Sequence, residues 1–211
     1  MEKTGEFGWL RGMLFPIHRH EFRKFIPLTT IFCLLSMMYA MLRGLKEIFL
    51  LQHSTVEAMY FLKLFAVTPS MVLLTFLYSR ISKLTNRDGR FNAVVGYFLA
   101  FFAIAHFFFI PHLEVLQLNK MADRLTVSMP SLHNLWEVLR IWPLSLLYIH
   151  AEGCVTMVWG VALWTFINEI THLEQSKRFY SLLGLGAEIG LISAGILLKY
   201  SKMGLNTLLS L

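Results

Sequence analysis

The sequence predicts an all-α integral membrane protein with about five transmembrane helices. Of its 211 residues, 56% are hydrophobic and 15% are charged, whereas soluble domains have about 25% charged residues. The apolar residues form long runs, and most Lys and Arg residues lie in short segments between them. The formal net charge is +6. This placement of the basic residues is typical of a membrane protein and argues against a nucleic-acid partner.

A membrane span needs about 20 predominantly apolar residues. The apolar runs predict spans over 25–42, 59–78, 92–110 and 182–198, and the remaining run covers 135–170. A helix over this last run would be about 54 Å long, against a hydrocarbon core of about 30 Å. It either projects from the membrane or breaks near Pro143 or Gly153. Because no polar loop divides it, we expect one long, kinked helix.

Three parts are expected along the chain: a cytoplasmic N-terminal segment over 1–24, a transmembrane helical domain over 25–200 and a short tail over 201–211. With the N-terminus inside, 11 basic residues lie in inner segments and 6 in outer segments. This asymmetry predicts a cytoplasmic N-terminus. The segment before the first apolar run lacks the apolar region that a cleaved signal peptide has. No transit-peptide-like extension is evident either, and this favours a bacterial inner membrane.

Several ionisable residues interrupt or border the apolar runs, namely Lys46, Glu57, Lys63, Arg140 and Glu152. A charge in or beside a span is costly, so it usually faces a cavity or a partner and marks a pathway. The cations outnumber the anions. This pattern predicts a site for an anionic solute in a transporter-like protein.

Several segments together resemble the bacterial and plastid ADP/ATP translocase family. Met41-Leu-Arg-Gly-Leu-Lys-Glu47 is similar to the family's Leu-Arg-Asp-Thr-Lys-Asp motif, and Trp164 with Phe166-Ile-Asn-Glu-Ile-Thr171 is similar to its Trp-Gly-Phe-Ala-Asn-Glu-Ile-Thr motif. The other matching pieces are Pro16–Lys24 with Pro27, Phe61–Lys63, Leu139-Arg140 with Trp142, Ala151-Glu152, Lys177–Tyr180 and Gly184–Ala187. Their order and spacing are collinear with the family over about residues 15–200.

The resemblance implies part of the N-terminal half of a major-facilitator-like transporter of about twelve spans, which exchanges ATP for ADP or takes up nucleotides. Gly44 and Leu45 depart from the family's Asp and Thr, and Gly153 and Cys154 from its Leu-Trp pair. Because the chain ends after the fifth apolar run, we expect a truncated or split family member, with a second chain supplying the missing helices. The alternative is a non-transporting remnant or a structural membrane protein.

Lys46, Lys63 and Arg140 are the predicted phosphate ligands, and the resemblance also singles out Lys46. The alternative for Lys63 and Arg140 is that they reach the membrane surface along their apolar stems. Glu152 is the predicted gating partner, pairing with a lysine when substrate is absent; the alternative is a fixed ion pair. Glu57 and Glu169 are further ion-pair candidates, with a solvated loop and a solvated helix end as alternatives. Tyr39, Trp142 and Tyr148 could stack on adenine or serve only in packing.

An enzyme is the disfavoured class. Glu169-Ile-Thr-His172 has the spacing of one half of a di-iron site, but no second copy or further carboxylates accompany it. No nucleophile elbow and no phosphate-binding glycine loop of the P-loop type is present in the sequence. Cys33 and Cys154 show no zinc spacing. We therefore expect no metal and no cofactor, and the predicted partners are ATP, ADP and the lipid bilayer.

Overall fold

The computed structural model describes residues 16–209, and that part consists of helices joined by short turns and contains no strand. Most of the expected N-terminal segment 1–24 and the last two residues of the expected tail lie outside the described residues. Five helices are long and apolar enough to cross a membrane. They confirm the predicted number of spans and cover Arg19–Leu51, Val56–Leu84, Gly89–Phe109, Trp142–Ile170 and Leu173–Tyr200.

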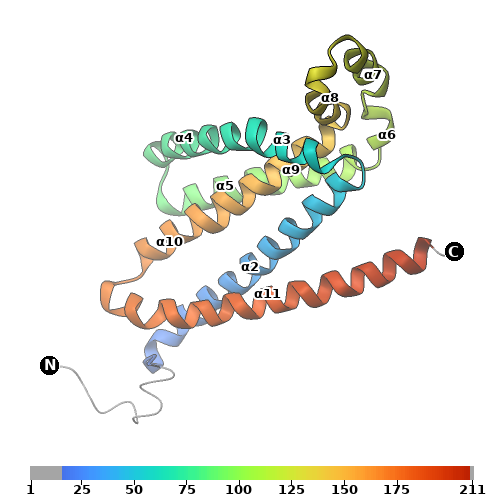
Figure 1. Ribbon diagram of the computed structural model, residues 1–211. Helices are drawn as coiled ribbons and strands as arrows, with labels where there is room; N and C mark the ends of the chain where they lie inside the picture. The colour runs from blue at the N-terminus through green and yellow to red at the C-terminus, as the bar shows by residue number, and fades with distance from the viewer. Residues whose placement is uncertain (1–15, 210–211) are drawn as a thin grey trace. The chain divides into compact units, whose positions relative to one another are not determined.

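Each span consists of one or more helical elements (Figure 1). The first contains η1 (Arg19–Glu21) and α2 (Phe22–Leu51). The second joins α3 (Val56–Leu62), η2 (Lys63–Val67) and α4 (Thr68–Leu84), and the third joins α5 (Arg87–Ile104) and η3 (Ala105–Phe109). The fourth joins α9 (Trp142–Cys154), η5 (Val155–Ala162) and α10 (Leu163–Ile170), and the fifth lies in α11 (Leu173–Leu209).

The first helix is longer than its apolar run. The predicted span ends at residue 42, but α2 continues to Leu51. Hydropathy marks only the apolar part of a helix, whereas the following Arg43, Lys46 and Glu47 are strong helix formers. Lys46 therefore lies on the same continuous helix, beyond the end of the apolar run that predicts the first span.

The expected single helix over 135–170 is also wrong. The helix α8 (His133–Arg140) ends before Ile141, whose φ of −105° and ψ of 36° are not helical, and α9 begins at Trp142. Pro143 occupies the start of α9, where its missing N–H is tolerated, whereas inside a longer helix its ring would clash with the preceding turn. The fourth span then continues for 29 residues without a break at Gly153.

Short helices connect the third and fourth spans. These are α6 (Leu113–Leu116), α7 (Asn119–Ser128), η4 (Pro130–Leu132) and the already named α8. The Trp142 indole N–H donates to the Leu116 carbonyl at 2.7 Å, which ties α6 to the start of α9.

The second, third and fourth spans each contain a π-helical segment: η2, η3 and η5. In η2, the amide of Thr68 bonds to the carbonyl of Lys63 five residues earlier. The following Pro69 has no N–H to continue a regular ladder, which accounts for the wider turn there. Segments of this kind are frequent at functional sites, and η2 begins at Lys63, one of the predicted phosphate ligands.

The chain divides into two compact units, and the first combines residues 1–41 with 167–211. Within its described part, α2 and α11 approach closely at two glycines. A Cβ added to Gly186 would lie 2.7 Å from the Cγ2 of Thr29, and one added to Gly190 would overlap the carbonyl oxygen of Cys33. Such small residues allow backbones to pack together in a membrane.

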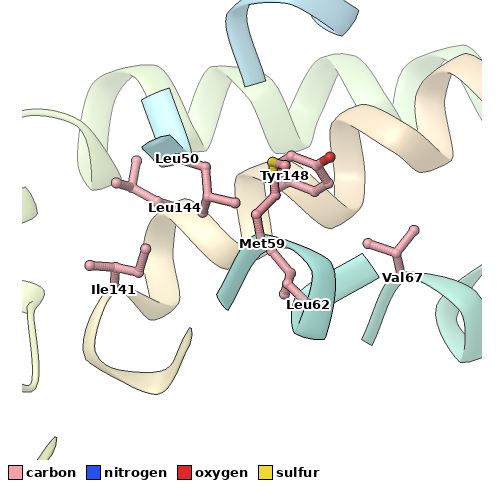
Figure 2. Close-up of a cluster of buried hydrophobic side chains, with 7 residues drawn as sticks. All are labelled: Leu50, Met59, Leu62, Val67, Ile141, Leu144 and Tyr148. Carbon is pink, nitrogen blue, oxygen red and sulfur yellow. The ribbon is translucent and has the colours of Figure 1, made fainter. Parts of the chain in front are cut away.

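The second unit spans residues 42–166. Its buried cluster consists of Leu50, Met59, Leu62, Val67, Ile141, Leu144 and Tyr148 (Figure 2). These side chains come from the end of α2, from α3 and η2, and from the start of the fourth span. Tyr148 is fully buried among them. This cluster fixes the end of α2 against α9, and hence positions the charged residues that those helices carry.

The α2–α11 contact gives a test with a matched control. Gly190→Ala should destabilise the protein by about 1–3 kcal/mol, because the added methyl group forces the two backbones apart. Gly195, on the same helix, has nothing within 4 Å of its added Cβ among the described residues. Gly195→Ala should therefore preserve stability or raise it by about 1 kcal/mol through helix propensity. Thermal unfolding in detergent measures both, and equal unfolding temperatures for the two variants would contradict the close contact.

Candidate functional site

Lys46 is the most deeply buried lysine in the part of the chain whose side chains the structure describes. Its side chain is only 5% exposed, and its ammonium forms an ion pair with Glu152 of α9. Lysine is almost never buried to this extent without a partner, because an unpaired charge in a low-dielectric interior is very costly. The Glu152 side chain is 34% exposed. The two partners therefore differ sharply in their access to solvent.

Tyr148 connects Lys46 to Lys63. The Lys46 Nζ lies 4.8 Å from the centre of the Tyr148 ring, and the Lys63 Nζ lies 5.9 Å from the same point. Both distances are within the range of cation–π attraction. Tyr148 and Glu152 are four residues apart on α9, so their side chains share one face of the helix. A single helical face thus presents an aromatic ring and a carboxylate to the two lysines.

Glu47 completes the arrangement. Its carboxylate accepts a hydrogen bond from the Lys63 ammonium at 3.3 Å, which is also an ion pair. We name the five residues Lys46, Glu47, Lys63, Tyr148 and Glu152 the Tyr148 cluster. It contains two cations and two anions from three different spans, so its charges balance.

The Tyr148 hydroxyl adds a polar group to the Tyr148 cluster. It is buried and lies within interaction distance of the Lys63 ammonium. An ammonium can only donate, so the hydroxyl keeps its own hydrogen for an acceptor. A ligand that carries several anionic oxygens could bond this hydroxyl and displace the carboxylates from the lysines. The arrangement is therefore suited to binding a compact polyanion in exchange for internal ion pairs.

The structure gives Arg140, the third predicted phosphate ligand, a different setting. Its guanidinium pairs with Asp123 of α7 at 2.7 Å and with Glu137 of its own helix at 3.1 Å. The Arg140 Nε is buried without a hydrogen-bond partner within the described residues. The structure thus brings Lys46 and Lys63 together at Tyr148, whereas Arg140 joins α8 to the connecting helix α7.

The remaining predicted acids lie on exposed surfaces. Glu57 is in the first turn of α3, where a negative charge is favoured by the helix dipole. Glu169 is near the end of α10 and is exposed. Arg178, which follows it on α11, pairs at 2.6 Å with Glu21.

Glu21 is the centre of a polar network in the first unit. Its side chain is 3% exposed, and besides the Arg178 ion pair it accepts a hydrogen bond from the Gln175 side chain at 3.3 Å. Lys24 bonds the Gln175 side chain at 3.0 Å and the carbonyl of Ile170. This network ties the start of the first span to the junction of α10 and α11.

Sequence reasoning missed Glu47 and Glu21 as ion-pair partners. Glu47 directly follows Lys46, and this neighbouring pair of opposite charges beside an apolar run was the available signal. Glu21 had no comparable signal, because its partners are more than 150 positions away in the chain. Tyr148, considered for stacking on adenine, is fully buried in the hydrophobic cluster and has Lys46 over its ring instead.

Because Lys46 and Glu152 pair, we expect substitution of Lys46 alone to destabilise the protein more than substitution of both residues. Lys46→Met should destabilise the protein by about 2–3 kcal/mol, because Glu152 loses its partner; partial exposure of Glu152 keeps this below the cost for a fully buried pair. Adding Glu152→Gln should recover most of the loss. Thermal unfolding in detergent measures this, with Lys120→Met on the exposed face of α7 as the control. Additive losses in the double variant would contradict the pairing.

Comparison with known proteins agrees with this architecture. The family model described as TLC ATP/ADP transporter matches residues 1–209. ADP,ATP carrier protein 1 of Chlamydia pneumoniae is 36% identical over 200 residues, covering 92% of this chain and 39% of that protein. ADP,ATP carrier protein 4 of Rickettsia prowazekii is 35% identical over 197 residues, covering 93% of this chain and 38% of that protein.

A third relative, ADP,ATP carrier protein 3 of Rickettsia conorii, is 32% identical over 199 residues, covering 94% of this chain and 40% of that protein. The chain thus spans about two fifths of the length of these relatives. No solved structure gives a significant match. A family match over nearly the whole chain, in a protein with five membrane-spanning helices, leads to one conclusion: the chain belongs to the TLC ATP/ADP transporter family.

Proposed function

We propose that this protein serves nucleotide antiport, exchanging ATP for ADP across a membrane, and that the Tyr148 cluster binds the nucleotide's phosphates. The observation that carries the proposal is the burial of Lys46 between Glu152 and the Tyr148 ring, with Lys63 at the same ring. The relatives' names, ADP,ATP carrier proteins, supply the substrate class.

The charges of a polyphosphate are strongly hydrated in water, so a binding site must replace that hydration. Fixed ammonium groups and hydrogen-bond donors do so. Lys46 and Lys63 provide the ammonium groups, and the buried Tyr148 hydroxyl provides a donor. Arg140 remains a predicted phosphate ligand, and its use would require release from Asp123 and Glu137.

Glu152 has the role of gate in this proposal. In the absence of nucleotide it neutralises Lys46, so the empty site carries no unpaired buried charge. An arriving phosphate competes for the same lysine and releases the carboxylate. When nucleotide leaves, the ion pair forms again. Coupling between nucleotide binding and ion-pair breakage gives a physical basis for exchange. Glu57 and Glu169 remain predicted gating or ion-pair residues.

We further place the protein in a bacterial inner membrane with its N-terminus in the cytoplasm. The support for the orientation is the excess of basic residues, 11 against 6, in segments that this topology puts inside. The support for a bacterial membrane is that the relatives are proteins of Chlamydia and Rickettsia.

Uptake into liposomes tests the transport proposal directly. The purified chain is reconstituted into liposomes that contain ADP, and labelled ATP is added outside. Antiport predicts uptake that requires internal ADP and that unlabelled external ATP suppresses. The controls are liposomes that contain the protein but no internal ADP, and liposomes without protein. Nucleotide binding without exchange would contradict transport by this chain and favour the non-transporting alternative.

Two matched variants test the role of the Tyr148 cluster. Lys46→Gln should weaken ATP binding roughly 10- to 150-fold, because one charge-assisted contact is worth about 1.5–3 kcal/mol. Glu152→Gln should bind ATP at least as tightly as the unmodified protein, because the competing carboxylate is gone.

Binding is measured by the nucleotide-dependent rise in unfolding temperature of each folded variant. A purely structural ion pair predicts that both substitutions weaken binding to a similar extent, and that result would contradict the proposal. Lys120→Gln controls for the loss of a positive charge outside the cluster.

A further inference from the structure

We propose that an anionic phospholipid binds to the second unit along a hollow between α4 and α5. One acyl chain lies in the hollow, and the phosphate lies at Arg90. This lipid site is separate from the Tyr148 cluster and does not depend on the proposed transport activity.

The hollow has a volume of about 180 Å³ and apolar walls. Leu74, Leu77 and Ile81 line it from α4, Ala93 and Tyr97 line it from α5, and the buried Met157 lines it from η5. Figure 1 shows α4 and α5 running back along each other from the short turn that joins them. Sites for compact drug-sized ligands are typically about 300–1,000 Å³. An apolar hollow of this size between two helices instead fits a segment of a single hydrocarbon chain.

The surroundings of the hollow point to the bilayer as the source of its occupant. Its rim residues Leu77 and Tyr97 are 45% and 49% exposed, and their neighbours Val72 and Phe76 on α4 are more exposed still. These residues belong to helices that are long and apolar enough to span a membrane. Exposed apolar side chains on such helices are normal where lipid tails cover them. An acyl chain is the occupant that this setting supplies.

The charge at the turn favours an anionic headgroup. The segment from residue 80 to residue 90 contains four basic residues and one acidic residue. Among them, Arg90 is one helical turn before Ala93 and Val94, on the face of α5 that lines the hollow. Its Nη1 donates to the Ser82 carbonyl at 3.4 Å, which holds the side chain beside the end of α4. A guanidinium fork is well suited to binding phosphate oxygens in pairs.

Native mass spectrometry of the detergent-purified chain tests the site. Phosphatidylglycerol and phosphatidylcholine with identical acyl chains are offered at equal concentrations. The anionic lipid should be retained in preference to the zwitterionic one. Equal retention of the two lipids by the unmodified protein would overturn the proposal.

Two pairs of substitutions locate the binding. Ala93→Leu places extra volume in the hollow and should reduce retention of both lipids at least several-fold. Ala100→Leu is the same change at an exposed position of α5 that does not line the hollow, and it should have no effect. Similar retention by Ala93→Leu and the unmodified protein would overturn the proposed chain position.

Arg90→Gln should lower the preference for phosphatidylglycerol roughly five-fold, the effect expected for one basic residue near an anionic lipid. Lys83→Gln is the control, because it also removes a positive charge near this turn. Lys83 is two residues from Ile81 and therefore lies on a different face of α4 from the hollow, so the substitution should change the preference less than two-fold. Equal effects of the two substitutions would overturn the role of Arg90. A second protein copy retained in place of lipid, and lost in Ala93→Leu, would also overturn the proposal.

Discussion

The second unit depends on one constraint: a lysine side chain that is only 5% exposed must keep an opposite charge next to its ammonium group. Lys46 meets this constraint through Glu152, and α2 is thereby linked to α9 by more than apolar contact. The hydrophobic cluster around Tyr148 holds the helix ends in register, so that the carboxylate lies within reach. Removing that packing would leave the ion pair unsupported, and removing the ion pair would leave a charge in the packed interior. Packing and electrostatics are therefore coupled at this point.

The two units are held together internally by different means. In the first, glycines of α11 let its backbone approach α2 directly, and a buried Glu21 satisfies polar groups from the junction of α10 and α11. In the second, three spans contain π-helical segments, and the ion pairs of Lys46 and Lys63 connect separate helices. A wider helical turn rotates the residues that follow it relative to a regular helix. In η2 this occurs immediately after Lys63, so the turn contributes to the direction of that span beyond the cluster.

The five spans could be predicted from sequence because the hydropathy of a run is the sum over its own residues and does not depend on what packs against it. The sequence could not show whether the helix breaks or only kinks near Pro143, because a proline permits either. The non-helical backbone of Ile141 shows that the helix breaks there. Lys46, Lys63 and Glu152 stood out because charges among apolar residues are rare. Their partners depend on helix register and distant packing, which one sequence does not record: Glu47 was passed over in favour of the exposed Glu57, and Arg140 was grouped with lysines although it pairs with Asp123.

The unequal exposure of the Lys46–Glu152 pair indicates which partner a ligand would replace. Moving Lys46 into water would require its stem to leave a packed environment, whereas the Glu152 side chain is already 34% exposed. Releasing the carboxylate toward solvent therefore requires less rearrangement of the surrounding packing than releasing the ammonium. An anion that binds Lys46 restores the charge balance that the departing carboxylate removes. A cation would have to take Glu152 and leave Lys46 buried and unpaired, which is the costlier state. The arrangement consequently favours anions over cations as competing ligands.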